Sequence, residues 1–222
     1  MSNTKKLRKV FGFLLVFGPA LFLILISTSR CKHRFKTLDD YGQVKHYSFT
    51  DSYGKTRTAS EFKEELVLIT TIQKTCPYDC SISFWRLNQL IYQHIRKNSH
   101  KKLKRVRIIS FVTDGKGNPS NHAIMVRQMM EREVEGYDPK LWIIATGDVR
   151  SIYDIKNNNQ TLLETGDQYY GGEAFQELML LTDKQNHLRM VLKGNQEGLI
   201  RRMKESIALL LKQYDKDRAM RK

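Results

Sequence analysis

The stretch Val67-Leu-Ile-Thr-Thr-Ile-Gln-Lys-Thr-Cys-Pro-Tyr-Asp-Cys80 joins an apolar, β-prone run to two closely spaced cysteines. Residues 66–72 have the composition of a buried strand, and residues 81–97 carry apolar side chains at helical spacing. The pattern therefore predicts that the cysteines lie where a buried strand is followed by a helix.

The spacing of Cys76 and Cys80 suits redox or metal chemistry. If the helix begins near Pro77, a residue favoured at the first helical position, Cys76 is the N-cap and Cys80 follows one turn later. Their Cα atoms would then be about 6 Å apart, within the range that a disulfide can close. A helix N-terminus favours a thiolate, which is both a nucleophile and a soft-metal ligand. The alternative is a static disulfide or two buried thiols.

The N-terminal region predicts a membrane anchor. Residues 10–27 contain no charge, are mostly apolar and are just long enough to span a bilayer, and they follow a basic tail over residues 1–9. A cleaved signal peptide is the alternative. Lipid attachment at Cys31 is disfavoured because Arg30 replaces the small residue that a lipoprotein signal requires.

Four Lys and Arg residues precede the predicted anchor and four follow it closely, so the positive-inside count does not decide the orientation. A nine-residue tail before a large domain favours a domain outside the cytoplasm, in the periplasm if the source is bacterial. We expect a tether over residues 28–45, a single domain over residues 46–214 and a charged tail over residues 215–222. The net charge of +15 is concentrated near the predicted membrane, because residues 1–36 hold eight of the 38 Lys and Arg residues and none of the 23 acidic ones. The basic run 96–107 lacks interleaved aromatic residues for base stacking, so no nucleic-acid partner is expected.

The order of elements predicts an α/β fold. Strands alternating with helices favour a parallel sheet with right-handed crossovers, and a final hairpin and helix complete a thioredoxin-like plan. Inward positions are expected at Ile82, Trp85, Leu87, Leu90, Ile91 and Ile95 in the first helix and at Ile124, Met125, Met129 and Val134 in the second. The sequence predicts a hairpin over 46–58 and a short helix over 59–65. Strands are expected at 66–72, 106–113, 141–146, 177–182 and 187–192. Longer helices are expected at 81–97, at 120–135, after Asp148 and over 196–212, with a long loop at 157–173.

Several motifs resemble those of one family. Thr75-Cys-Pro-Tyr-Asp-Cys80 after a buried strand resembles the C-P-x-x-C signature of Sco/SenC proteins, which are membrane-anchored thioredoxin-fold proteins tied to cytochrome c oxidase maturation. The run Val106–Asp114 is similar to a family strand that ends in aspartate, and Leu141–Asp148 is similar to its later strand and T-G-D turn. Leu180–Asp183 followed by Leu188-Arg189 is similar to the last hairpin, so the resemblance covers much of residues 45–212.

The resemblance implies a copper site that this sequence does not complete. In the family, two cysteines and a histidine hold copper, and matching the hairpin puts Phe175 at the place of the histidine. No histidine occurs between His122 and His187, so a third ligand would have to be His122, His187, Met179 or a loop residue. Ser81 also replaces the second proline that usually follows the second cysteine.

The sequence therefore favours a membrane-anchored, extracytoplasmic thiol–disulfide redox protein in copper handling or oxidase maturation, with Cys76 and Cys80 as the catalytic pair. The alternatives are a copper-binding chaperone that uses the same cysteines as metal ligands, and a non-catalytic anchored interaction protein. A cytochrome c oxidase subunit or another redox protein is the expected partner. Asp114 either tunes the protonation of the cysteines or caps its loop. Met125, Met129 and Met130 resemble a soft-metal stripe, but Met125 and Met129, at helical spacing, are expected to be core residues.

Overall fold

The computed structural model describes residues 15, 17–20, 22–23, 37–73, 82–99, 105–154, 156–157, 160–161 and 172–220, so Cys31, Cys76 and Cys80 all lie outside the described residues. The chain divides into two compact units, residues 1–36 and 37–222. The described residues of the first unit are helical. Within the described ranges, no helix is both long and apolar enough to cross a membrane. Most of the predicted anchor 10–27 lies outside those ranges.

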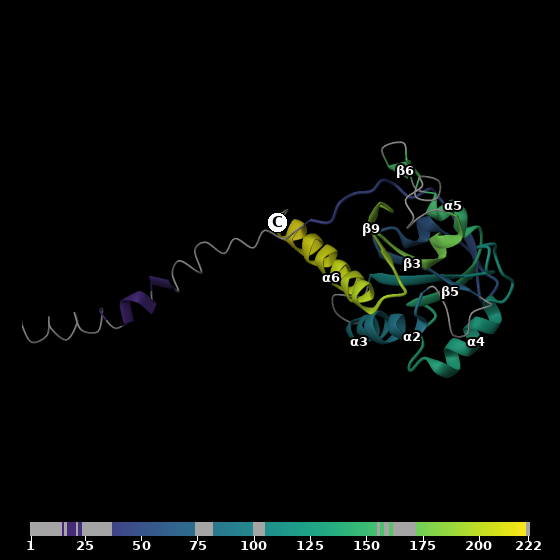
Figure 1. Cartoon of the computed structure of the whole chain (residues 1–222), viewed down its shortest axis with the longest axis horizontal. Coiled ribbons are helices and arrows are strands. Elements are labelled where there is room, and N and C mark those ends of the chain that lie inside the picture. The colour runs from purple at the N-terminus through teal and green to yellow at the C-terminus, as the bar shows by residue number, and fades with distance from the viewer. Residues whose placement is uncertain are drawn as a thin grey trace, which may run out of the picture. The chain divides into compact units, whose positions relative to one another are not determined.

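The second unit is built on a seven-stranded sheet with the spatial order β2-β1-β5-β4-β3-β8-β9 (Figure 1). The central strands β3, β4 and β5 are parallel, and the other neighbouring strands are antiparallel. These strands are β1 (Ser48–Asp51), β2 (Thr56–Thr58), β3 (Leu66–Gln73), β4 (Val106–Thr113), β5 (Trp142–Thr146), β8 (Leu178–Thr182) and β9 (Leu188–Lys193). A separate antiparallel pair consists of β6 (Lys156–Asn157) and β7 (Gln160–Thr161).

The strands predicted from apolar runs are confirmed. β3 and β4 pair in parallel along their full length, from Leu66 opposite Val106 to Gln73 opposite Thr113. Their side chains are almost all buried, as expected for parallel strands covered on both faces. The predicted hairpin before them and the hairpin after them are confirmed as β1–β2 and β8–β9.

Two apolar clusters cover the two faces of the sheet. Alternate residues of β3 divide between them: Leu66 and Leu68 point to one cluster, and Val67 and Ile69 to the other. We call the first the helix-side core; it includes Leu68, Ile91, Ile108, Met130, Trp142, Met179 and Met203. The second, the opposite core, includes Tyr47, Phe49, Phe62, Ile69, Phe111, Ile143, Tyr153 and Phe175.

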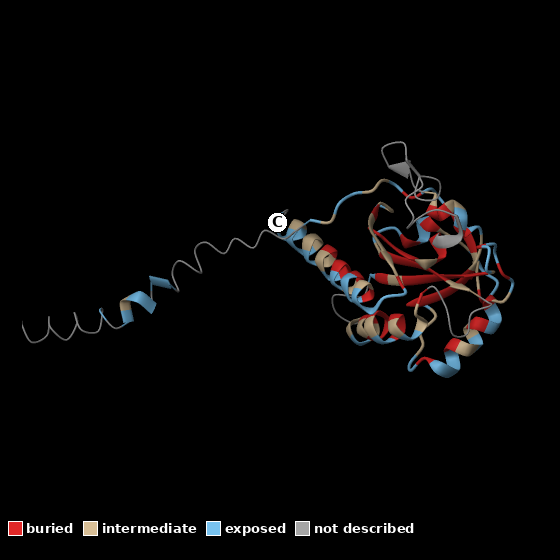
Figure 2. Ribbon diagram, in the orientation of Figure 1, coloured by how far each residue is buried: buried red, intermediate tan, exposed pale blue. Residues whose placement is uncertain are grey.

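Helices bury one face each against these clusters, and Figure 2 shows the buried stripe along α6. The helix-side core is covered by α2 (Phe84–Leu87), the π-helical segment η2 (Asn88–Tyr92), α3 (Gln93–Asn98), α4 (Ala123–Glu133) and α6 (Glu197–Met220). The opposite core is covered by the 3₁₀ helix η1 (Ala59–Phe62), α5 (Val149–Tyr153) and the 3₁₀ helix η3 (Gly172–Glu177).

The first long helix begins later than predicted. Residues 82 and 83 are not helical, so the helix that was expected from near Pro77 begins at Phe84. Ser83 is extended because its N–H donates to the carbonyl of Gly194, 2.9 Å away. The predicted inward position of Trp85 is wrong: its side chain is 65% exposed, while Leu87, Ile91 and Ile95 form the buried face.

The inward face of α4 is also different from the prediction. Ile124 and Met125 are 55% and 52% exposed, and the buried positions are Ala123, Val126 and Met130. These three recur at the spacing of one helix face, so α4 turns this face toward the sheet. The predicted burial of Val134 is confirmed.

The domain extends beyond the predicted boundaries at both ends. Residues 37–45, predicted as tether, lie against the hairpin β8–β9: the Tyr41 N–H donates to the Leu188 carbonyl and the Leu188 N–H donates to the Gly42 carbonyl, both at 2.9 Å. At the other end α6 continues past Lys212 to Met220. Tyr214 supports this extension because the Lys184 ammonium lies 4.3 Å from the centre of its ring.

Candidate functional site

The cysteine segment, residues 74–81, is attached to the centre of the sheet. It follows Gln73 at the carboxyl end of β3, which has β4 on one side and β8 on the other. The chain leaves β3 for β4, and it later returns to the other side of β3 as β8. Such a switch point at the carboxyl end of a parallel strand is where α/β proteins place their sites. Cys76 and Cys80 themselves lie outside the described residues.

Buried structure holds the cysteine segment at both ends. Gln73 pairs with Thr113 in the sheet, and Ile82, at the other end, is only 4% exposed. Ile82 packs on Gly194 so closely that a Cβ atom at Gly194 would lie 2.8 Å from two of its side-chain carbons. The Ser83–Gly194 hydrogen bond fixes the same point. The described residues on both sides of the cysteine segment are therefore held by the sheet and by Gly194.

Gln176 ties together the strand ends beside the cysteine segment. Its side chain is 1% exposed, and its Oε1 accepts a hydrogen bond from the Thr113 hydroxyl at 2.7 Å. Its Nε2 donates to the Gly115 carbonyl at 3.1 Å, and its backbone carbonyl accepts from the Thr71 hydroxyl at 2.7 Å. Buried polar groups satisfied in this way fix geometry, so Gln176 holds the ends of β3, β4 and β8 in one arrangement.

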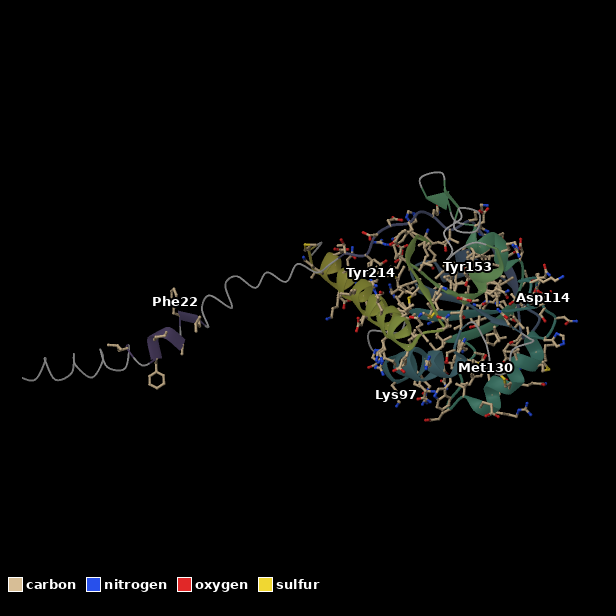
Figure 3. All side chains as sticks on the ribbon, viewed as in Figure 1. Phe22, Lys97, Asp114, Met130, Tyr153 and Tyr214 are labelled. Atoms are coloured by element: carbon tan, nitrogen blue, oxygen red, sulfur yellow. The ribbon has the colours of Figure 1, made fainter. Side chains whose placement is uncertain are left out.

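Phe175, which the sequence matching predicts to replace the family histidine, is a core residue. Its side chain is fully buried, and its ring centre lies 5.2 Å from that of Tyr153. The Arg150 guanidinium lies 5.2 Å from the same ring centre and donates to the Lys116 carbonyl at 2.9 Å. Burial raises the pKa of Tyr153, whose hydroxyl donates to the Leu178 carbonyl. Figure 3 shows Tyr153 inside the domain and Asp114 at its periphery.

The loop after β4 closes directly on Phe175. Gly117 has a positive φ of 81°, and a Cβ atom there would lie 2.5 and 2.7 Å from two ring carbons of Phe175. Only glycine avoids both the strained backbone and the overlap. The loop 114–119 therefore packs directly on Phe175.

A matched pair of glycines tests this packing. Gly117→Ala should destabilise the protein by about 1–3 kcal/mol more than Gly54→Ala, because overpacking against Phe175 adds to the cost of positive φ. Gly54 has nearly the same φ, 80°, but no atom within 4 Å of its Cβ position, so it isolates the backbone cost. Urea unfolding of the two variants measures the difference, and equal losses would show that the loop does not press on Phe175.

Asp114 has the loop-capping role that was one of its two predicted roles. Its Oδ1 accepts from the backbone N–H groups of Lys116 and Asn118, both at 2.8 Å, and its Oδ2 accepts from the Asn118 amide at 2.9 Å. The Asn118 side chain, followed by the Asn118 backbone N–H, holds the pKa of Asp114 below its usual value. The Asp114 carboxylate is thus ionised, and both of its oxygens accept hydrogen bonds from its own loop.

The described candidates for a third copper ligand lie in separate parts of the domain. No group of three or more His, Cys, Asp and Glu side chains that could hold a metal is found among them. His187 lies in the β8–β9 turn at the far end of the sheet, where its Nδ1 is 2.8 Å from Asp40 Oδ2. His122, before α4, is 3.0 Å from the Ser120 hydroxyl, and Met179 is fully buried in the helix-side core.

The three methionines of α4 differ in burial. Met130 is fully buried in the helix-side core. Met129 is partly buried against the same core. The core prediction for Met125 is wrong, since half of its side chain is exposed.

Two pockets of the described residues lie where the strand β3 begins. One of about 340 Å³ is lined by residues such as Tyr47, Lys63, Val67 and Lys184. Another is lined in part by Glu65, Arg107 and Lys140. Neither of these two borders Gln73, the last described residue before the cysteine segment.

Two residues near the carboxyl end of β4 escaped the sequence prediction. Gln176 and Arg150 belong to no motif, and nothing in their spacing distinguishes them from surface residues. Their roles depend on contacts with Thr113 and Lys116, which are distant in the sequence. The only signal was indirect: both lie beside elements that had been matched to the family pattern.

Comparison with known proteins identifies the fold. No protein-family model and no curated protein matches the sequence. Among solved structures, one match is BsSco, a member of the Sco family of cytochrome c oxidase assembly proteins in which a disulfide switch was identified. BsSco is 15% identical to this chain, with a TM-score of 0.51, and the match covers 77% of this chain and 97% of BsSco. A putative electron transfer protein from Aquifex aeolicus VF5 is 14% identical, with a TM-score of 0.50 and coverage of 78% and 98%. ScoI from Bradyrhizobium japonicum, solved with copper bound, is 18% identical, with a TM-score of 0.46 and coverage of 78% and 99%.

Identities this low establish the fold alone. The mixed sheet with helices on both faces, together with these matches, shows that the chain has the thioredoxin-like fold of Sco proteins, which confirms the predicted fold class.

Proposed function

We propose that this chain is a membrane-anchored, extracytoplasmic thiol–disulfide redox protein of the Sco type, in which Cys76 attacks and Cys80 resolves. One observation carries the proposal: the segment with both cysteines directly follows the central strand of a thioredoxin-like sheet, at its switch point. The family resemblance gives the context, which is copper handling or cytochrome c oxidase maturation. The uncharged run 10–27 behind a basic tail supports the anchor.

The proposed exchange needs only the two cysteines and a disulfide in the partner. The Cys76 thiolate attacks one sulfur of that disulfide, forms a mixed disulfide and releases the other sulfur as a thiolate. Deprotonated Cys80 then attacks the Cys76 sulfur, closes the Cys76–Cys80 disulfide and releases the second partner thiolate. Two electrons pass to the partner, and the protons of the cysteine pair pass to solvent and to the released thiolates. The reverse sequence oxidises a partner dithiol.

Phe175 supports redox exchange over copper delivery. The family copper site needs a histidine where this chain has an aromatic side chain that is fully buried in the opposite core. A buried benzyl group cannot donate to a metal, whereas exchange requires no third ligand. The Gln176 contacts support the same function, because they hold the strand ends beside the segment without contributing a metal ligand.

A trapping experiment tests the proposed function. In the full chain, Cys80→Ser should accumulate a mixed disulfide with a partner on Cys76, because the resolving thiol is absent. Non-reducing electrophoresis followed by mass spectrometry identifies the adduct, and dithiothreitol should reverse it. Cys31→Ser is the matched control and should trap nothing. Failure of Cys80→Ser to trap a partner, or trapping that persists when Cys76 is also replaced, would contradict the assignment.

A copper titration distinguishes a redox protein from a copper-binding chaperone. Two thiolates alone can hold Cu(I) in linear geometry, so weak binding by the reduced chain is compatible with a redox protein. Sub-micromolar binding of one equivalent, abolished by Cys76→Ser, together with no trapped partner, would favour the copper chaperone. If replacing both cysteines left the phenotype of the intact protein unchanged, the non-catalytic interaction protein would be favoured.

A further inference from the structure

The pocket of about 340 Å³ beside the start of β3 has the features of a small-molecule site, and the proposed redox exchange does not use it. Its volume falls in the range of small-ligand pockets. Its apolar wall belongs to the opposite core and consists of residues that are each at most 9% exposed: Val44, Tyr47, Ala59, Phe62 and Val67. A ligand in this pocket would therefore lay an apolar body against the opposite core.

Hydrogen bonds join the three segments that surround this pocket. Val44 lies in the segment before β1, and its N–H donates to the carbonyl of Asn186 in the β8–β9 turn at 2.9 Å. The Asn186 side-chain amide donates back to the Val44 carbonyl at 3.0 Å. The Glu64 N–H, which follows η1, donates to the Lys184 carbonyl of the same turn at 3.2 Å. The fold thus forms the pocket before any ligand binds, as is usual for small-molecule sites.

One ammonium group of the lining remains available to a ligand. The Lys184 Nζ lies 4.0 Å from Glu64 Oε2, and Asp183, the acidic residue of the lining, pairs with Arg189 at 3.0 Å. Lys63 lines the same pocket, and its ammonium forms no ion pair with any described residue. The unbalanced charge of the lining is therefore positive, which favours an anionic ligand.

The hydroxyl of Tyr47 is also without a hydrogen bond to any described residue. The side chain is only 4% exposed, with its ring centre 6.2 Å from that of Phe49. Burial raises the pKa of Tyr47, so the hydroxyl stays protonated and able to donate. Because buried polar groups are nearly always hydrogen-bonded, an unpartnered hydroxyl on a residue that lines a pocket indicates an acceptor from outside the chain.

We propose that this pocket binds a small amphipathic carboxylate, whose apolar body lies against Phe62 and Val67 and whose carboxylate accepts from Lys63 and Tyr47. An ionised oxygen accepts stronger hydrogen bonds than a neutral one, so the charge of the ligand contributes to its selection. The site uses no residue of the cysteine segment, and it is therefore independent of the proposed redox function.

Titration of the full chain with phenylbutyrate tests the site. In two-dimensional amide NMR spectra, the signals of Val44, Ser60 and Gln185, which line the pocket, should shift together and saturate. The expected Kd is about 1 mM or below, as is usual for so small a ligand. Phenylbutyramide has the same apolar body without the charge, and it should bind about fivefold more weakly, because Lys63 is exposed and its ion pair is partly screened.

Three variants locate the recognition. Lys63→Met should weaken phenylbutyrate binding about fivefold and leave phenylbutyramide binding unchanged, so the preference for the acid disappears. Tyr47→Phe should weaken the binding of both ligands, since both offer an acceptor oxygen. Lys97→Met is the matched control, because Lys97 is an exposed lysine of α3, which covers the other face of the sheet. It should change neither Kd, and urea unfolding verifies that each variant is folded.

Three results would overturn the carboxylate site. They are the absence of shifts in the pocket signals up to about 10 mM phenylbutyrate, equal Kd values for the acid and the amide in the wild-type chain, and equal losses in Lys63→Met and Lys97→Met. Each result would leave the exchange between Cys76 and Cys80 standing, since trapping on Cys76 is measured separately.

Discussion

Phe175→Ala is expected to lower the free energy of unfolding by about 3–5 kcal/mol, the usual cost of removing a fully buried phenylalanine. The loss combines the transfer free energy of the ring with the cavity left between Tyr153, Arg150 and the loop at Gly117, all of which touch or closely approach it. Chemical denaturation of the full chain, followed by far-UV circular dichroism, measures the change.

A second variant, Phe175→His, tests whether a histidine at this position is tolerated. It should cost a similar free energy, because the imidazole would replace an apolar ring at a site with no exposure and leave polar nitrogens to be desolvated. Restoring the family residue should therefore not restore a stable copper site. A loss below about 1 kcal/mol in both variants would show that residue 175 is accessible, and it would remove the main argument against copper delivery.

Trp142→Ala is expected to destabilise the protein by about 3–5 kcal/mol as well. The side chain is fully buried, lies between Phe84 and Tyr92, and donates from Nε1 to the Ser110 hydroxyl at 2.8 Å. Ser110 is in turn 2.6 Å from the Thr70 hydroxyl, so one polar chain joins β5, β4 and β3 within the core. The same denaturation experiment measures the effect.

A double-mutant cycle separates this hydrogen bond from packing. Trp142→Phe keeps most of the ring contacts but removes the donor, and Ser110→Ala removes the acceptor. The two changes should couple by about 0.5–1.5 kcal/mol, the net contribution of one such bond. Strict additivity of the two losses would mean that the indole is held by its packing alone.

The sheet was predictable because its signal is local. β3, β4 and β5 are nearly continuous apolar runs, and such runs specify buried parallel strands without reference to the rest of the chain. The turn at Asp114 and the helix cap at Asp148, which accepts from the Ser151 N–H, follow equally local rules.

The buried faces of the helices were harder to predict, because large apolar residues were assigned to the core. In α4 the strongly apolar Ile124 and Met125 were expected inside, but Ala123, Val126 and Met130 form the buried face. Periodicity identifies the apolar positions of a helix but does not say which of them face the core. Trp85 on α2 is likewise a large apolar residue that was expected to be buried but is exposed.

The start of the cysteine helix depended on a contact that is distant in the sequence. Ser83 is held out of the helix by Gly194, which follows β9, and Gln176 gains its role only when β8 returns beside β3. The precise arrangement of the cysteine segment could not follow from Pro77 alone. The match of Phe175 to the family histidine is a prediction from the sequence, and the structure adds that Phe175 is packed in the core.

The contacts of residues 37–45 also protect this protein against aggregation. Exposed edges of sheets invite strand-to-strand aggregation. One edge strand, β2, is only three residues long, and the other, β9, is paired at its first residue with residues 41 and 42. Arg189 and Lys193 add charge to β9 and are paired with Asp183 and Glu177. The sheet is thereby protected at both margins, so encounters with other proteins are directed away from backbone pairing and toward side-chain surfaces.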